Sequence, residues 1–390
     1  MPVIPVDRAV GQRLSHTIRS RDGRVLLRAG VVLTAHDARR LQDTFGMRYI
    51  LVHNEVLPDL DVQDVDLDER VRQDAMNSLR TTIDVVRRRT GKDASVQAFR
   101  AAESIVEAVL SADGVPMALA VLRTKEDDLL QHCVNTAAYS ALIGIGAGLA
   151  RRELELVTLG GLLHDLGKAL IPVEILAKPG RLTPAEREVM NRHSQLGFEA
   201  ISRDLPTLPA QVAAVAYQHH ERLNGSGYPE GMRGEQIHRF ARIVAVADVY
   251  DALCAMRPYK PPWPPHRAVA FLVHHPELFE RDSVYQLMRK VAVYPTGTIV
   301  RLADRSLAVV LSQNADHPEA PFVLVVADHA NVPVTPPRAV DLAVAGADLL
   351  PIHTASWRWP REVRAALDIE GVRAAARAAL FDRGAGATRP

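Results

Sequence analysis

The sequence predicts a mainly α-helical protein with a small β-rich module at each end. Apolar residues recur at helical spacing through residues 61–290, whereas residues 1–60 and 291–355 alternate apolar and polar residues between turn residues. The chain has 390 residues, 47% apolar and 24% charged, as in ordinary globular proteins. This length allows one large domain with appendages, or two to three domains.

Composition excludes several classes of protein. With 47 basic and 46 acidic residues the net charge is only +1, so no global basic field favours a nucleic-acid polymer. Two cysteines, Cys133 and Cys254, make a disulfide framework unlikely and favour the cytoplasm. The N-terminus lacks the pattern of a secretory signal. The uncharged run Cys133–Ala150 contains polar residues and glycines, so we expect a buried core helix rather than a membrane span.

Residues 1–60 are predicted to form the N-terminal β-rich module. Strand-like alternation surrounds Gly23 and Gly30, and one helix is expected between a cap at Thr34 and an end at Gly46. No chemical motif occurs here, so we interpret the segment as an adaptor or sensor module.

Residues 61–120 are predicted to form two connecting helices. Each carries an apolar stripe, which packs either on a neighbouring helix or on a second copy of the chain, so a homodimer is one possibility. The run Arg87–Arg89 is interpreted as a solvated face.

Residues 121–290 are predicted to be consecutive helices that form the central domain. Thr183 to Glu186 reads as a capping box with a proline at the first helical position, so a helix is expected to begin there. Residues 291–355 form the second β-rich module, and residues 356–390 are expected to contain a last helix and a disordered tail from Gly384.

The residues that carry chemistry are histidines and aspartates of the central domain. His164 and Asp165 are adjacent, His219 and His220 are adjacent, and Asp248 stands among apolar residues where a lone carboxylate would be costly. A bridged metal pair requires neutral imidazoles and a carboxylate that can contact both ions. We therefore interpret seven residues as ligands of one metal cluster: His132, His164, Asp165, His193, His219, His220 and Asp248.

The motifs around these residues resemble a known family. Four features occur in the order and at the spacing of the HD-GYP family: HDLGK, a downstream histidine, HHERLNGSGYP and ARIVAVADVYDALCAMRPYK. Its members are HD-superfamily phosphodiesterases that hydrolyse cyclic di-GMP. The resemblance covers roughly residues 125–285 and implies an all-helical HD-type core. It also implies the same seven ligands, with Asp165 bridging two or three ions, most often iron or manganese.

The resemblance implies further site residues, each with a plainer alternative. Asp128 stands four residues before His132 and corresponds to a third-ion ligand, although it is shorter than the usual glutamate and fits a surface carboxylate equally well. Lys168 is expected to contact the scissile phosphate or to polarise the attacking water, with a solvated lysine at a helix end as the alternative. Asn224 replaces the usual aspartate, which we expect to tune the site.

Substrate contacts are implied at the GYP loop, Gly225–Pro229, and at the RPYK motif, Arg257–Lys260. Gly227 allows close backbone approach, and Tyr228 either lines the pocket or packs structurally. Arg257 and Lys260 are expected to bind nucleotide phosphate or base, with a helix-end role as the alternative. Arg242 and Asp251 are expected to orient the ligands.

The resemblance implies hydrolysis of cyclic di-GMP to pGpG, GMP or both by a metal-bridged hydroxide, with effects on bacterial motility and biofilm formation. It also implies a possible partner, such as a diguanylate cyclase, at the GYP loop. Two alternatives remain open. One is another HD-superfamily hydrolase of nucleotides or cyclic dinucleotides, and the other is a non-hydrolytic cyclic di-GMP sensor or scaffold.

Overall fold

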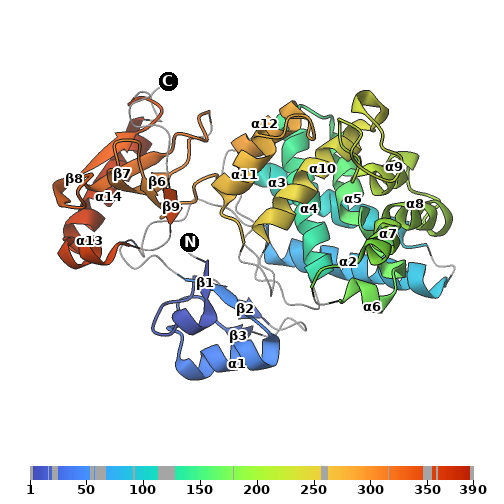
Figure 1. The fold of residues 1–390 in the computed structure, drawn as a ribbon, viewed down its shortest axis with the longest axis horizontal. Helices are drawn as coiled ribbons and strands as arrows, with labels where there is room; N and C mark the ends of the chain where they lie inside the picture. The colour runs from blue at the N-terminus through green and yellow to red at the C-terminus, as the bar shows by residue number, and fades with distance from the viewer. Residues whose placement is uncertain are drawn as a thin grey trace.

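A computed structural model of the chain describes residues 3–15, 17–19, 25–52, 57, 67–90, 93–112, 128–178, 180–255, 262–314, 316–345, 354–356 and 359–386. It confirms the mainly helical fold with small antiparallel sheets near both ends. The helices between residues 69 and 290 gather in one body, and the N-terminal and C-terminal modules lie beside it (Figure 1).

The N-terminal module has the predicted strands and helix. β1 (Val3–Pro5) pairs antiparallel with β4 (Tyr49–Leu51), and β2 (Ile18–Arg19) pairs with β3 (Val25–Leu27). A short 3-10 helix, η1 (Val6–Arg8), follows β1, and α1 (Ala35–Phe45) lies between β3 and β4 in the chain. The capping box joins Thr34 and Asp37, and the helix ends at Gly46 with a positive φ of 63°, as predicted.

The two predicted connecting helices are part of the central hydrophobic core. Apolar side chains of α2 (Glu69–Arg88) and α3 (Ser95–Ser111) share one buried cluster with α4 (Asp128–Gly146) and α5 (Arg151–Leu163). Their stripes therefore pack on neighbouring helices of the same chain, and dimerisation through them stays a prediction.

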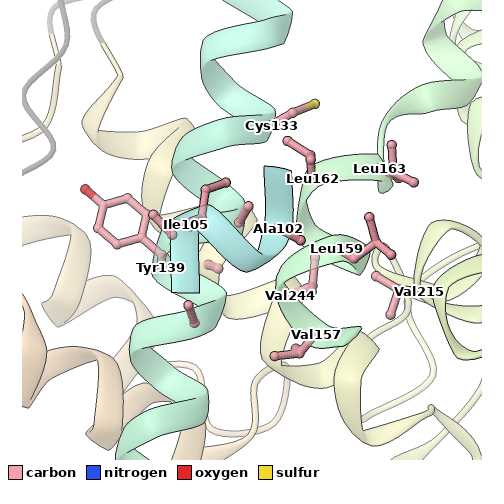
Figure 2. Packing of buried hydrophobic residues seen from close by; sticks show 14 of the residues in the cluster. Ala102, Ile105, Cys133, Tyr139, Val157, Leu159, Leu162, Leu163, Val215 and Val244 are labelled. Atoms are coloured by element: carbon pink, nitrogen blue, oxygen red, sulfur yellow. The ribbon is translucent and has the colours of Figure 1, made fainter. Parts of the chain in front are cut away.

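Helix α4 is buried along nearly its whole length, as its uncharged sequence predicted. Figure 2 shows Tyr139 of α4 near Ile105 of α3, with Leu159 of α5 and Val215 of α9 in the same cluster. Within the described residues, no helix combines the length and the apolar character that crossing a membrane requires.

Helices within residues 210–290 pack directly on α4 and α5. The capping box of α7 at Thr183 and Glu186 is present as predicted. In chain order the elements are η2 (Leu166–Leu170), α6 (Val173–Leu176), α7 (Pro184–Asn191), α8 (His193–Asp204), α9 (Ala210–Gln218), η3 (Gly234–Gln236), α10 (Arg239–Cys254), α11 (Pro265–Val273) and α12 (Arg281–Lys290).

The C-terminal module is a five-stranded antiparallel sheet with the order β8-β7-β6-β5-β9. Its strands are β5 (Ile299–Arg301), β6 (Leu307–Ser312), β7 (Phe322–Ala327), β8 (Pro333–Asp341) and β9 (Thr354–Ser356). Helices α13 (Arg361–Ala366) and α14 (Ile369–Gly386) share a buried cluster with side chains of this sheet. α14 ends at Gly386 and residues 387–390 lie outside the described residues, so the disordered tail from Gly384 stays a prediction.

Candidate metal centre

The structure brings the seven predicted ligands together from five helices. His132 lies in α4, and His164 and Asp165 follow α5 directly. The others lie at the start of α8, just after α9 and within α10: His193, His219, His220 and Asp248. Six of these seven side chains form two groups in which the ligand atoms lie within 4.8 Å of one another. One group is His132, His164 and Asp165, and the other is Asp165, His193, His219 and His220.

Asp165 is the residue that the two groups share. Its Oδ1 lies 3.3 Å from Nε2 of His193 and 3.8 Å from Nε2 of His219. Its Oδ2 lies 3.4 Å from Nε2 of His164 and 3.6 Å from Nε2 of His132. The two carboxylate oxygens therefore face different sets of imidazoles, which is the arrangement that a bridging carboxylate requires.

Asp248 faces the cluster from α10. Its Oδ1 lies 3.1 Å from Nε2 of His132, and its Oδ2 lies 3.9 Å from Nδ1 of His220. Burial would raise the pKa of Asp248, but its hydrogen bond to His132 and the nearby imidazoles hold that pKa well below the ordinary value. The site thus contains a second ionised carboxylate.

Three of the histidines are oriented by the backbone of their own segment. Nδ1 of His164, His193 and His219 lies 2.7, 2.7 and 2.9 Å from the carbonyl oxygens of Gly161, Met190 and Ala216. In each case Nδ1–H must donate, because a carbonyl can only accept. The lone pair of Nε2 is therefore left to face the cluster, as a metal ligand requires.

His132 is oriented differently, by a side-chain carboxylate. Its Nδ1 donates to Oδ2 of Asp251 at 2.6 Å, which agrees with the orienting role expected for Asp251. Asn135 donates to the other oxygen of Asp251 at 2.9 Å, and Arg72 donates to Asn135 at 2.9 Å. Sequence analysis missed Asn135 and Arg72, although Asn135 lies one turn after His132 on the same helix.

Two buried polar atoms of the cluster make no hydrogen bond within the described residues. They are Nε2 of His164 and Oδ1 of Asp165. Leaving such atoms unpaired is costly, and a cation between them would satisfy both. The donor set of imidazoles and carboxylates therefore fits divalent metal ions.

The protonation states of four candidate ligands in the free site also suit metal binding. Burial lowers the pKa of His193 to about 4 and holds the pKa values of His219 and His220 well below the ordinary value. Burial would raise the pKa of Asp165, but the charge of Lys168 and the nearby imidazole of His164 hold that pKa well below its usual range. These imidazoles are therefore neutral and this carboxylate is ionised at neutral pH.

Lys168 lies at the edge of the cluster in η2. Its Nζ donates to Oδ2 of Asp165 at 2.5 Å, and its side chain remains 24% exposed. A cation that is anchored to the shared carboxylate and still reaches solvent is placed to meet an anionic ligand.

The GYP loop packs directly over the second histidine pair. A Cβ at Gly227 would lie 2.4 Å from the Cα of Glu221 and from the carbonyl oxygen of His220, so only glycine fits there. The ring of Tyr228 lies 4.7 Å from that of His220, centroid to centroid, at an angle of 33°. Tyr228 therefore both packs on a candidate ligand and lies beside the cluster.

Glu221 is a loop-positioning residue that sequence analysis missed. Its buried carboxylate accepts hydrogen bonds from the backbone N–H groups of Glu230, at 2.7 Å, and Met232, at 3.0 Å. No local pattern signals this role, because both partners lie about ten residues away along the chain.

The other predicted residues lie farther from the two groups or outside the described residues. Asn224 is exposed and accepts from the backbone N–H of Ser226 at 3.0 Å, so its side chain shapes the loop. Arg242 pairs with Glu280 at 3.0 Å rather than with a ligand. Asp128 begins α4 and belongs to neither ligand group among the described residues. Arg257 and Lys260 lie outside the described residues.

Comparison with known proteins confirms the resemblance predicted from the motifs. Residues 116–281 match the family model described as "HD domain". The chain is 35% identical over 245 residues to "Cyclic di-GMP phosphodiesterase PA4108" of Pseudomonas aeruginosa. This match covers 63% of this chain and 59% of that protein.

Two shorter matches agree with this result. One is 43% identical over 151 residues to "Cyclic di-GMP phosphodiesterase response regulator RpfG" of Xanthomonas campestris, covering 38% of this chain and 40% of the relative. The other is 40% identical over 132 residues to "3'3'-cGAMP-specific phosphodiesterase 2" of Vibrio cholerae, covering 34% of this chain and 25% of the relative. The chain thus spans less than two thirds of the length of each of these relatives.

Proposed function

From the HD domain at residues 116–281, we propose that this protein is a metal-dependent phosphodiesterase that hydrolyses cyclic di-GMP. The observation that carries the proposal is the position of Asp165 between two groups of histidines. Relatives named for cyclic di-GMP hydrolysis support this substrate.

Each residue of the centre has a distinct part in the proposed reaction. Divalent ions, when bound, would supply Lewis acidity and activate water for attack on phosphorus. His132 and His164 would hold one ion, His193, His219 and His220 would hold the other, and Asp165 would contact both. Asp248 would hold an ion through the oxygen that faces His132. A third ion beside Asp128 is a further part of this proposal.

Lys168 would stabilise negative charge on the phosphate. Its ammonium is held by Asp165 and its side chain is partly exposed, so it would meet a phosphate oxygen at the cluster without a large movement. Tyr228, stacked beside His220, would border the bound nucleotide. Arg257 and Lys260 are proposed to contact the base or phosphate of the same ligand. We propose pGpG, GMP or both as products.

The test is turnover by protein purified without oxygen and loaded with iron or manganese. We expect cyclic di-GMP to be hydrolysed faster than 3'3'-cGAMP and deoxynucleoside triphosphates. His164→Ala serves as the control and should abolish hydrolysis with all three. The proposal is wrong if metal-loaded protein binds cyclic di-GMP tightly but forms no product, because that result identifies a sensor or scaffold.

A second candidate substrate is 3'3'-cGAMP, favoured by the relative named for it. It differs from cyclic di-GMP in one base, so the metal centre and the phosphate contacts serve both equally. Faster turnover of 3'3'-cGAMP in the same assay would establish this alternative while leaving the metal centre unchanged.

A further inference from the structure

We propose that Arg72 is a positioning residue that fixes His132 for metal binding through Asn135 and Asp251. The inference rests on the proposed function, because it concerns one ligand of the proposed metal centre. Arg72 lies in α2, outside the residues 116–281 that match the HD domain. A helix from the preceding segment would therefore complete the site.

The connection is an unbroken series of hydrogen bonds across three helices. Arg72 of α2 donates to Oδ1 of Asn135 in α4 at 2.9 Å. Nδ2 of Asn135 donates to Oδ1 of Asp251 in α10 at 2.9 Å. Oδ2 of Asp251 accepts from Nδ1 of His132 at 2.6 Å, which directs Nε2 of this ring toward Asp165 and Asp248.

Arg72 and Asp251 hold the amide of Asn135 from its two ends. An arginine can only donate and an ionised carboxylate can only accept, so the amide oxygen must face Arg72 and the amide nitrogen must face Asp251. Without Arg72 the amide oxygen loses this buried donor, and the amide is held less firmly in place. The hydrogen bond from Asn135 to Asp251 would then be weaker, and the carboxylate that orients His132 would be less firmly positioned.

Burial makes this arrangement sensitive to the charge of Arg72. The guanidinium is always ionised, yet the residue is only 2% exposed. Glu69 lies 3.9 Å away but is 51% exposed, so solvent weakens that pair. Asp251 is a buried carboxylate on the other side of Asn135, so loss of Arg72 also removes a buried charge of opposite sign near it.

His132 is the candidate ligand whose orientation depends most on Arg72. The Nδ1 atoms of His164, His193 and His219 are held by backbone carbonyls three residues earlier, which do not depend on α2. Nδ1 of His132 depends on side chains from α10, α4 and α2 instead. Loss of Arg72 should therefore weaken one metal site and spare the other.

The experiment is a titration of metal-free protein with Mn²⁺, with the affinity of each site measured by calorimetry. For Arg72→Met we expect the affinity of one site to fall roughly 10- to 100-fold, the range seen when partners of metal ligands are removed. The second site should keep its affinity. Arg72→Lys should restore part of the loss, because it retains a charged donor. Arg70→Met is the matched control, since Arg70 is an exposed arginine of the same helix.

Two further variants keep the test decisive if Arg72→Met folds poorly. Asn135→Asp retains an acceptor for Arg72 but removes the N–H donor to Asp251, so it should weaken the same single site. Adding Arg72→Met to His132→Ala should cause no further loss at that site. An equal loss at both sites, or no loss in Arg72→Met and Asn135→Asp, overturns the inference. Wild-type protein that binds no divalent ion would instead refute the metal centre itself.

Discussion

Gly167 lies directly against the backbone of His193. A Cβ at position 167 would come within 1.9 Å of the carbonyl oxygen of His193 and 2.5 Å of the backbone nitrogen of Gly197. Because no side chain fits, η2 and α8 meet backbone to backbone. This contact helps place Nε2 of His193 3.3 Å from Oδ1 of Asp165. The glycine of the HDLGK motif is therefore required for steric reasons, between two candidate ligands.

Gly167→Ala should separate η2 from α8. The atom that the new methyl group meets is backbone, which cannot rotate away, so we expect a loss of about 1–3 kcal/mol in unfolding free energy, as for other overpacked sites. Occupancy of the metal site that contains His193 should fall as well. Thermal unfolding and metal analysis measure the two effects.

Gly197→Ala is the control for this prediction, because its added methyl group would make a milder contact at the same interface. Its new Cβ would lie no closer than 3.3 Å to a neighbouring atom, and alanine suits a helix better than glycine. This variant should lose less stability than Gly167→Ala. Equal losses in the two variants would contradict the steric explanation.

Asp165→Asn should remove both ions, whereas single histidine variants should remove one. Asp165 belongs to both ligand groups, while His132 and His193 each belong to one. We expect metal content to fall from about two ions per chain to near zero in Asp165→Asn, and to about one in His132→Ala or His193→Ala. Elemental analysis after gel filtration measures the content. A full complement of ions in Asp165→Asn would show that this carboxylate does not bridge the sites.

Lys168→Met should lower turnover and leave the metal content unchanged. Nζ of Lys168 contacts Asp165 but adds no ligand atom, because a protonated amine can only donate. Losing one preorganised charge near the reacting phosphate typically lowers kcat roughly 100-fold or more. Lys178→Met is the matched control, since Lys178 is also half-buried and paired with a carboxylate, that of Glu186, at 2.7 Å. Similar losses in both variants would rule out a specific role for Lys168.

The sequence predicted the ligands better than the residues that hold them. Histidine and aspartate in adjacent pairs signal metal chemistry by residue type alone, and the seven predicted side chains do converge. Arg72, Asn135 and Glu221 carry no such signal, because each acts through partners that only the folded chain brings near. The helical frame was predictable for the same reason as the ligands, because the spacing of apolar residues and the type of a residue are both local properties of the sequence.

The pKa of His132 is raised in the metal-free protein. Burial would lower this pKa, but hydrogen bonds to Asp248 and Asp251 and the charges of both raise it to about 9. Both ring nitrogens therefore carry protons at neutral pH, and each donates to an aspartate. The ordinary pKa of histidine is 6.5, so folding favours the charged ring.

The metal-free protein should therefore lose stability as the pH rises from 6.5 through 9. The folded-state pKa lies above the unfolded one, so the contribution of His132 is complete below pH 6.5 and disappears as the ring deprotonates near pH 9. Chemical unfolding at successive pH values, in the presence of a chelator, measures this decline. Asp251→Asn removes one of the two charges that raise the pKa, so its decline should end at a lower pH. His132→Gln should lack this component of the decline altogether. If wild type and His132→Gln show the same pH dependence, the charged ring contributes nothing to the folded state.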